Sequence, residues 1–134
     1  MPDARYYLID TSYWITLWKT KEKSPSIERV EYLLSRPSAI PCINGIILAE
    51  LLRGLTKSRS DEKRKTCIYE LKCFDVTKET FIKAAELAQI LDRKGKTIAL
   101  PDCVIAANAI EQEAALITSD KHFARFKELE VVVV

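Results

Sequence analysis

Apolar residues along the chain fall into short runs that alternate with segments of helical periodicity. Between the runs, apolar positions recur every three or four residues, as on one face of an amphipathic helix. This alternation predicts an α/β domain with a mainly parallel sheet. No repeat or linker divides residues 1–134, so we expect a single domain. The runs interpreted as strands are Tyr6–Ile9, Ala39–Ile43, Phe74–Val76, Ala115–Ile117 and Val131–Val134.

The helical segments carry recognisable start and stop signals. Pro37 ends the second segment, and Gly95 stands where a glycine C-cap would end the long fifth one. Pro101 and Asp102 suit the first turn of the sixth. The expected helices cover Tyr13–Trp18, Ile27–Leu34, Ile46–Leu55, Asp61–Leu71, Phe81–Leu91, a segment that starts at Pro101, and a short His122–Leu129.

Composition narrows the functional classes. The 21 basic and 19 acidic residues leave a formal charge of +2, which excludes a histone-like polycation and an acidic tail protein. Nucleic-acid binding would therefore require a local basic patch. Neither a signal peptide nor a membrane-spanning run of roughly 18 apolar residues is visible, so we expect no membrane and a cytoplasmic location.

Cysteine and histidine usage argues against zinc. The four cysteines form no C-x-x-C pair, and His122 is the single histidine. In a reducing cytoplasm the thiols should be free, and we expect most of them to act as small buried hydrophobic residues.

Four acidic residues stand at notable places in the expected elements. Asp10 closes the first strand, Asp120 follows the fourth, and Asp102 begins a helix. Glu50 lies inside an apolar helix, so its carboxylate is expected to point away from open water. Ligand sites of open α/β sheets form beyond the carboxyl ends of strands. If the first and fourth strands are neighbours, Asp10 and Asp120 would lie in such a site.

Each acid taken singly also has an ordinary structural role open to it. Asp10 and Asp120 could cap the helices that follow them. Asp102 interacts favourably with a helix dipole whatever its function. Glu50 could pair with Arg53, three residues later, for about 0.2–0.5 kcal/mol.

Taken together, the acids favour a cation. Crowded carboxylates repel one another, and an unpaired buried charge is costly. Hard oxygen ligands without histidine or cysteine indicate Mg²⁺ or Mn²⁺. Such an ion suits a phosphate substrate, since it polarises the phosphoryl oxygen, stabilises the leaving oxygen and helps to ionise an attacking water.

The same segments resemble the four motifs of PIN-domain ribonucleases, most closely the VapC-type toxins of toxin–antitoxin pairs, over nearly the whole chain. The motifs that match in order are Leu8–Ser12, Ala49–Leu51 with Arg53–Gly54, Pro101–Asp102 with Ile105–Ala109, and Thr118–Phe123. The resemblance implies that Asp10, Glu50, Asp102 and Asp120 are catalytic metal ligands, Asp10 and Asp102 being the principal ones. It also implies supporting roles for Thr11, Ser12 and Thr118.

The resemblance further implies a PIN-like fold with a five-stranded parallel sheet in the order 3-2-1-4-5, flanked by helices. The implied activity is Mg²⁺- or Mn²⁺-dependent endonucleolytic cleavage of single-stranded regions of RNA. The implied partners are the RNA substrate, a small cognate antitoxin that inserts into the site, and a second copy of the chain in a homodimer.

Residues outside the acids add weaker indications. A basic cluster, consisting of Lys57, Arg59, Lys63, Arg64 and Lys65, is either a solvated helix face or a track for RNA phosphates. Trp14 and Trp18, four residues apart, suggest core or dimer packing first, an antitoxin groove second and base stacking third.

Three other functions remain to be weighed. An aspartate-based phosphatase usually needs a second aspartate two residues after the first, where this chain has Ser12. A phospho-receiver domain could use Asp75 as its acceptor, but the chain lacks the lysine that should follow the last strand. A catalytically silent PIN-like scaffold that binds RNA or protein is compatible with the acids, although their mutual repulsion would then serve no purpose.

Overall fold

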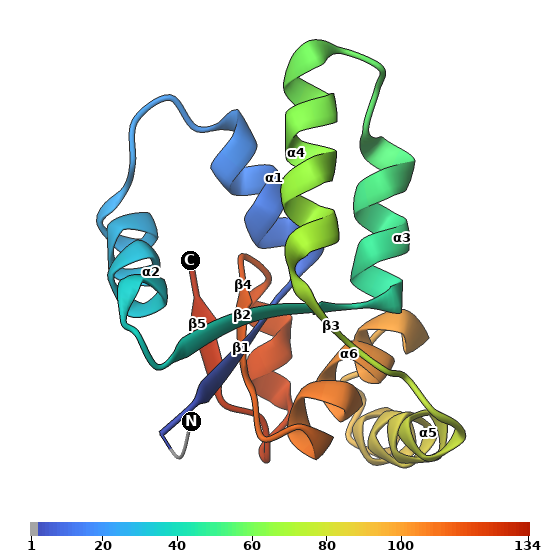
Figure 1. Cartoon of the computed structure of the whole chain (residues 1–134). Coiled ribbons are helices and arrows are strands. Elements are labelled where there is room, and N and C mark those ends of the chain that lie inside the picture. The colour runs from blue at the N-terminus through green and yellow to red at the C-terminus, as the bar shows by residue number, and fades with distance from the viewer. Residues whose placement is uncertain (1–2) are drawn as a thin grey trace.

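The computed structural model describes residues 3–134, and its centre is one five-stranded sheet (Figure 1). All four strand pairings are parallel, and the strand order is β3-β2-β1-β4-β5. The predicted fold class and strand order are thus confirmed, with the first and fourth strands adjacent. The strands are β1 (Arg5–Ile9), β2 (Ala39–Asn44), β3 (Lys72–Phe74), β4 (Ala115–Thr118) and β5 (Val131–Val133).

Helices cover both faces of the sheet. They are α1 (Thr11–Lys19), α2 (Pro25–Ser35), α3 (Gly45–Gly54), α4 (Arg59–Glu70), α5 (Lys78–Arg93), α6 (Leu100–Glu111) and the 3₁₀ helix η1 (Lys121–Arg125). Figure 1 shows α1 and α3 starting at the same edge of the sheet, where β1 and β2 end. Within residues 3–134, none of the helices combines the length and the apolar character that a membrane crossing requires.

The strands divide the core into two layers because successive side chains point to opposite faces. Tyr7 and Ile9 of β1 pack with Ile27 and Val30 of α2 on one face. Leu8 joins the larger cluster on the other face, with side chains from α3 to α6. Trp14 lies half-buried and donates from Nε1 to the Ile9 carbonyl at 3.2 Å. Trp14 and Trp18 are both partly buried and pack against the core clusters, so the core packing predicted for this pair is confirmed.

Local sequence signals explain where several elements begin and end. The side chains of Ser24, Asn44 and Ser58 accept backbone N–H bonds at the starts of α2, α3 and α4, as N-cap residues do. Gly95 follows α5 with a φ of 67°, a left-handed conformation that favours glycine. Its N–H bonds the Asp92 carbonyl and the next N–H bonds that of Leu91, which is a Schellman ending.

The structure corrects two element boundaries. The third strand is β3 at Lys72–Phe74, so the predicted Phe74–Val76 is displaced by two residues. Pairing with β2 sets this register, since Cys42 lies opposite Lys72 and Asn44 opposite Phe74. The last predicted helix, His122–Leu129, is the shorter η1, which ends at Arg125.

The prediction of free thiols is correct, whereas the prediction that most of the cysteines are buried is wrong. All four cysteines are free, but only Cys42 and Cys103 are buried. Cys67 and Cys73 are exposed, because one lies on the solvent side of α4 and the other on the edge strand β3.

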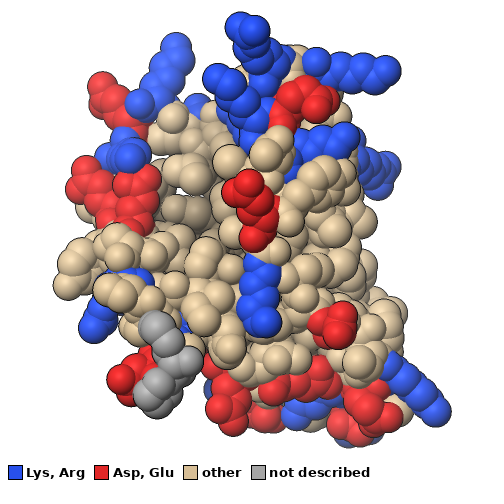
Figure 2. Space-filling model, in the orientation of Figure 1, with Lys and Arg blue, Asp and Glu red and all other residues tan. Residues whose placement is uncertain are grey.

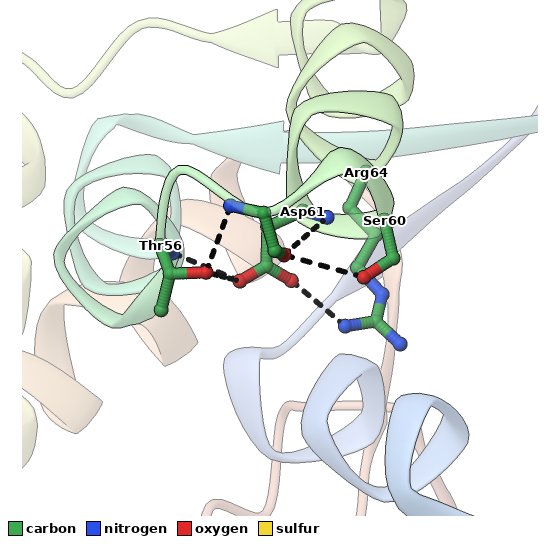
Figure 3. A network of polar contacts seen from close by, with 5 residues as sticks. Thr56, Ser60, Asp61 and Arg64 are labelled. Carbon is green, nitrogen blue, oxygen red and sulfur yellow. Dashed lines mark hydrogen bonds and ion pairs between the residues drawn. The ribbon is translucent and has the colours of Figure 1, made fainter.

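Helices α3 and α4 stand beside each other beyond the sheet (Figure 1), and a polar network joins them at their connection (Figure 3). The Asp61 carboxylate accepts from the Thr56 backbone N–H at 2.8 Å and from the Thr56 hydroxyl at 2.6 Å. Arg64 donates to the same carboxylate at 2.8 Å. These hydrogen bonds, from Thr56 and then from Arg64, lower the pKa of Asp61 to about 2.

The Asp61 network predicts a pH-dependent stability difference between the wild type and Asp61→Asn. The folded pKa of about 2 lies below the ordinary value of 3.8, so folding favours the carboxylate. The stabilisation is complete above pH 4 and disappears as the pH falls towards 2. Urea unfolding should therefore show the wild type as the more stable protein at pH 7. The difference in the free energy of unfolding between the two proteins should become smaller from pH 4 to pH 3. Glu62→Gln, at an exposed neighbouring position, should show no such narrowing. A stability difference that stays constant down to pH 3 would contradict the lowered pKa of Asp61.

Candidate active site

Asp10 occupies the centre of the candidate site, at the carboxyl end of β1. It stands at the N-cap position of α1, yet its side chain makes no capping bond. Its Oδ2 instead accepts from the Ser12 hydroxyl at 2.6 Å and from the Thr118 hydroxyl at 2.9 Å. The side chain, which follows β1, is thus fixed from α1 and from the neighbouring strand β4. Asp10 is only 5% exposed, so its carboxylate is held in a buried, oriented position.

The hydroxyls around Asp10 belong to a wider network that ties α1 to the segment after β4. Ser12 Oγ and Thr118 Oγ1 lie 3.0 Å apart. Ser12 Oγ accepts the Ser119 backbone N–H at 2.9 Å, and Thr118 Oγ1 accepts that of Asp120 at 3.0 Å. The predicted supporting residues Ser12 and Thr118 therefore lie at the candidate site.

Two further residues of this network were not anticipated from the sequence. The hydroxyls of Thr16 and Ser119 lie 3.0 Å apart and add a second link between α1 and the β4 end. Ser119 stands inside the fourth motif, which could have drawn attention to it. Thr16 lies one turn after Ser12, so helical periodicity could have placed it on the same face.

Asp102 lies in the first turn of α6 and is partly buried. Burial, and then the negative charges of Asp10, Asp120 and Glu50, raise the pKa of Asp102 to about 6. The charges of all three other predicted ligands therefore act on the carboxyl group of Asp102. The four acids, far apart in the sequence, are thus close enough for the charges of Asp10, Asp120 and Glu50 to act on Asp102.

Glu50 and Asp120 lie at the more exposed side of the site. Glu50 is exposed, in contrast to the expectation that its carboxylate avoids open water. Its apolar neighbours Ile47 and Leu51 face the core, whereas Glu50 points towards α1 and accepts the Thr11 hydroxyl at 3.1 Å. Within residues 3–134, the recorded ion pairs do not include the pairing of Glu50 with Arg53.

Asp120 serves as a cap as well as a site residue. Its Oδ1 accepts the His122 backbone N–H at 2.9 Å, at the start of η1. The same oxygen lies 3.0 Å from His122 Nδ1. The ordinary capping role predicted for Asp120 is therefore confirmed, and it coexists with a position beside the other acids.

The donor chemistry of this site suits a hard divalent cation. The side chains offer carboxylate and hydroxyl oxygens, and the repulsion that raises the pKa of Asp102 is the kind that a bound cation relieves. In the part of the chain that the structure describes, no group of three or more Asp, Glu, His or Cys side chains is arranged to hold an ion by itself. Mg²⁺ commonly needs only one or two carboxylates, because it keeps several waters.

The predicted basic cluster lies away from the sheet, at the beginning of α4. Figure 2 shows Lys and Arg side chains gathered at that end of the molecule. Lys57, Arg59 and Lys63 are exposed, whereas Arg64 is half-buried and bonded to Asp61. Lys65 places its ammonium 6.0 Å from the centre of the Tyr69 ring.

Comparison with known proteins gives a consistent result. The PIN domain family model matches residues 7–129. Ribonuclease VapC2 of Rickettsia felis is 30% identical over 128 residues, which cover 92% of this chain and 93% of that protein.

Two solved structures share the fold over nearly the whole chain. VapBC2 from Rickettsia felis, bound to a DNA fragment from its promoter, has a TM-score of 0.71 at 28% identity and covers 94% of this chain and 96% of its own. VapBC-1 from nontypeable Haemophilus influenzae has a TM-score of 0.76 at 27% identity, with the same coverage.

Proposed function

Because the chain belongs to the PIN-domain family, and to its VapC-type ribonucleases, we propose that it is a metal-dependent endoribonuclease that acts as the toxin of a toxin–antitoxin pair. The observation that carries the proposal is the effect of Asp10, Asp120 and Glu50 on Asp102, whose pKa is raised first by burial and then by their negative charges. Four carboxylates gathered at the carboxyl edge of a parallel sheet have an evident use in a hydrolase that handles phosphodiesters.

The roles proposed for the acids follow from their surroundings. Asp10 and Asp102 would hold a Mg²⁺ or Mn²⁺ ion, with Asp120 and Glu50 completing the negative site. When bound, the ion supplies charge neutralisation at the phosphate and assists ionisation of an attacking water. Ser12 and Thr118 orient Asp10 through their hydroxyls, and Thr11 orients Glu50. Attack of water at phosphorus, with cleavage of the P–O3′ bond and protonation of the departing 3′ oxygen, should leave a 5′-phosphate and a 3′-hydroxyl.

We propose RNA, an antitoxin and a second copy of this chain as the partners. The basic cluster at the start of α4 would bind RNA phosphates, which should make binding salt-dependent. Association with a second copy would cover apolar side chains that α5 and the start of α6 leave exposed, namely Phe81, Ile82, Ile90 and Leu100. We also propose a cytoplasmic location, where an RNA substrate would be available.

Cleavage of total RNA and of a panel of structured RNAs tests the proposed activity. The wild-type protein, free of antitoxin, should cut with Mg²⁺ or Mn²⁺, lose at least about 100-fold in rate in EDTA, and recover when metal is returned. Protein carrying Asp102→Asn, purified in the same way, controls for contaminating nuclease. Folded wild-type protein that cuts none of these RNAs with either metal would favour the silent scaffold. Cutting that survives EDTA would contradict metal dependence.

A further inference from the structure

A small hollow of about 140 Å³ lies between the end of α5 and the segment that follows η1. Leu87 and Leu91 of α5, together with Phe126, give it an apolar floor. This volume is well below the range of about 300–1,000 Å³ that is typical of small-molecule pockets, so the hollow suits a small group rather than a whole nucleotide. Three basic side chains also line it, and we call it the Lys94 hollow after the first of them: Lys94, Arg125 and Lys127.

The charge around the Lys94 hollow is mainly positive. Glu128 is the acidic side chain that lines it, and this carboxylate already pairs with Lys83 at 3.4 Å. Within residues 3–134, the recorded ion pairs do not include any of the three basic side chains of the hollow. Three exposed cations therefore face one carboxylate that is shared with a fourth cation.

Lys94 and Lys127 come close together although both carry a positive charge. Repulsion from Lys127 is the largest cause that lowers the pKa of Lys94, followed by loss of hydration, and Lys96 adds to the effect. The dipole of α5 favours a cation at its C-terminal end, which accounts for Lys94. It does not account for Lys127, which a different segment brings to the same place. Like charges gathered over an apolar floor form a place that an anion would stabilise.

The Lys94 hollow adjoins the two segments that carry Asp102 and Asp120. Lys94 is the C-cap of α5, and residues 95–99 connect it to α6, whose first turn holds Asp102. Arg125 ends the 3₁₀ helix η1, for which Asp120 is the N-cap. At a rise of about 2 Å per residue, Arg125 lies about 10 Å from Asp120 along that helix. An RNA chain bound at the acids would therefore have another of its phosphates within reach of the hollow.

An RNA phosphate is the anion that these observations favour. The hollow takes a small group, lies beside the acids where the proposed substrate would bind, and offers positive charge rather than groups that read a base. Figure 1 shows α4 and α5 at opposite ends of the molecule. The hollow and the basic cluster at the start of α4 would therefore hold different phosphates of one RNA chain.

We propose that the Lys94 hollow binds one phosphate of the RNA backbone, near the phosphate that is cleaved, and that Lys94 and Lys127 share it. The inference rests on the proposed nuclease function and adds a backbone contact that positions the RNA at the acids. Arg125 supplies a third cation. The apolar floor strengthens the attraction, because a charge next to apolar groups is less well screened by water. Such a contact should not depend on the base sequence.

The salt dependence of RNA binding tests this contact. Fluorescence anisotropy with a single-stranded RNA oligonucleotide in EDTA reports Kd without any cleavage. Each phosphate contact on a single strand contributes about 0.7 to the slope of log Kd against log salt concentration. Lys94→Gln should therefore lower the slope by about 0.7 and raise Kd about 5-fold near 0.1 M salt, and Lys127→Gln should do the same. The double variant should lose less than the sum of the two, because the lysines share one phosphate.

Removing single phosphate charges from the RNA locates the contact. A neutral methylphosphonate is placed at one backbone position at a time in an oligonucleotide with a mapped cleavage site. At one position near that site it should lower the wild-type slope by about 0.7 and leave the slope of Lys94→Gln unchanged. Equal effects on both proteins at every position would overturn the proposal. The same coupling in an RNA that the protein binds but does not cut would support the phosphate site and count only against the nuclease function.

Arg36→Gln is the matched control. Arg36 is exposed and precedes β2, at the sheet edge where the strands begin, so loss of its charge should leave the slope unchanged. Ile90 also lines the hollow and belongs to the face proposed to meet a second copy, so light scattering should measure the molar mass of each variant. Folded Lys94 and Lys127 variants with the wild-type slope would overturn the proposal. Variants that change the molar mass or antitoxin binding but not the slope would assign the hollow to a protein partner and overturn it as well.

Discussion

Asp10→Asn should reduce RNA cleavage by at least about 100-fold and leave the melting temperature equal to or above that of the wild type. The loss of cleavage follows because one of the two principal charges that hold the cation disappears, and about 2.7 kcal/mol of lost transition-state stabilisation already corresponds to 100-fold. The retained fold follows from the hydrogen bonds. An amide oxygen can still accept from Ser12 and Thr118, which lie 2.6 and 2.9 Å from Asp10 Oδ2.

The possible gain in stability has its own cause. The negative charge of Asp10 is the largest contribution, after burial, to the raised pKa of Asp102. Without that charge, the pKa of Asp102 should move towards its ordinary value, and the repulsion in the folded state should fall. A carboxylate that lowers stability in the absence of metal but is required for cleavage has a functional role rather than a structural one.

Asp75→Asn is the matched control for Asp10→Asn. Asp75 also follows a strand, β3, but it is exposed and is not among the charges that shift Asp102. Cleavage by this variant should stay within about twofold of the wild type. Single-turnover cleavage rates and thermal melts of the three proteins provide the comparison. If folded Asp10→Asn cleaves as fast as the wild type, the active site lies elsewhere.

The sequence alone predicts those features of the fold that depend on local pattern. Apolar runs located four of the strands to within one residue at each end, because buried parallel strands are nearly continuous in apolar residues. Asp10 and Asp120 could be placed together because parallel strands end at one sheet edge. The strand order itself came from family resemblance, since local pattern says nothing about which strands become neighbours.

Features set by long-range contacts were the ones that the sequence did not predict. Phe74 and Val76 both suit a strand, and only pairing with β2 shows that β3 ends at Phe74. Glu50 was expected to avoid water because apolar residues flank it, but its side of α3 faces α1 and solvent rather than the core. The sequence suggested that the five residues of the basic cluster act together. In the structure, however, Arg64 bonds to Asp61 and lies over the Trp18 ring.

Asn108→Ala should lower the free energy of unfolding by about 2–4 kcal/mol, because it leaves two polar groups without partners. Asn108 is fully buried in α6. Its Oδ1 accepts from Asn44 Nδ2 at 3.0 Å, and its Nδ2 donates to the Asp75 carbonyl at 3.1 Å. A buried polar group left without a hydrogen bond costs about 1–3 kcal/mol. For a chain of this size the melting temperature should fall by about 10 °C, which a calorimetric scan would measure.

A double-mutant cycle with Asn44 separates the lost hydrogen bonds from the lost volume. Asn44 caps α3 by accepting the Ile47 N–H at 3.1 Å, so Asn44→Ala alone should cost about 0.5–2 kcal/mol or more. The double variant should be less destabilised than the sum of the single ones, because it no longer leaves the Asn44 amide unpaired. Gln112→Ala, exposed at the end of the same helix, should change stability by less than about 0.5 kcal/mol. Strictly additive losses would show that Asn108 fills space rather than joining the ends of β2 and β3 to the helix that carries Asp102.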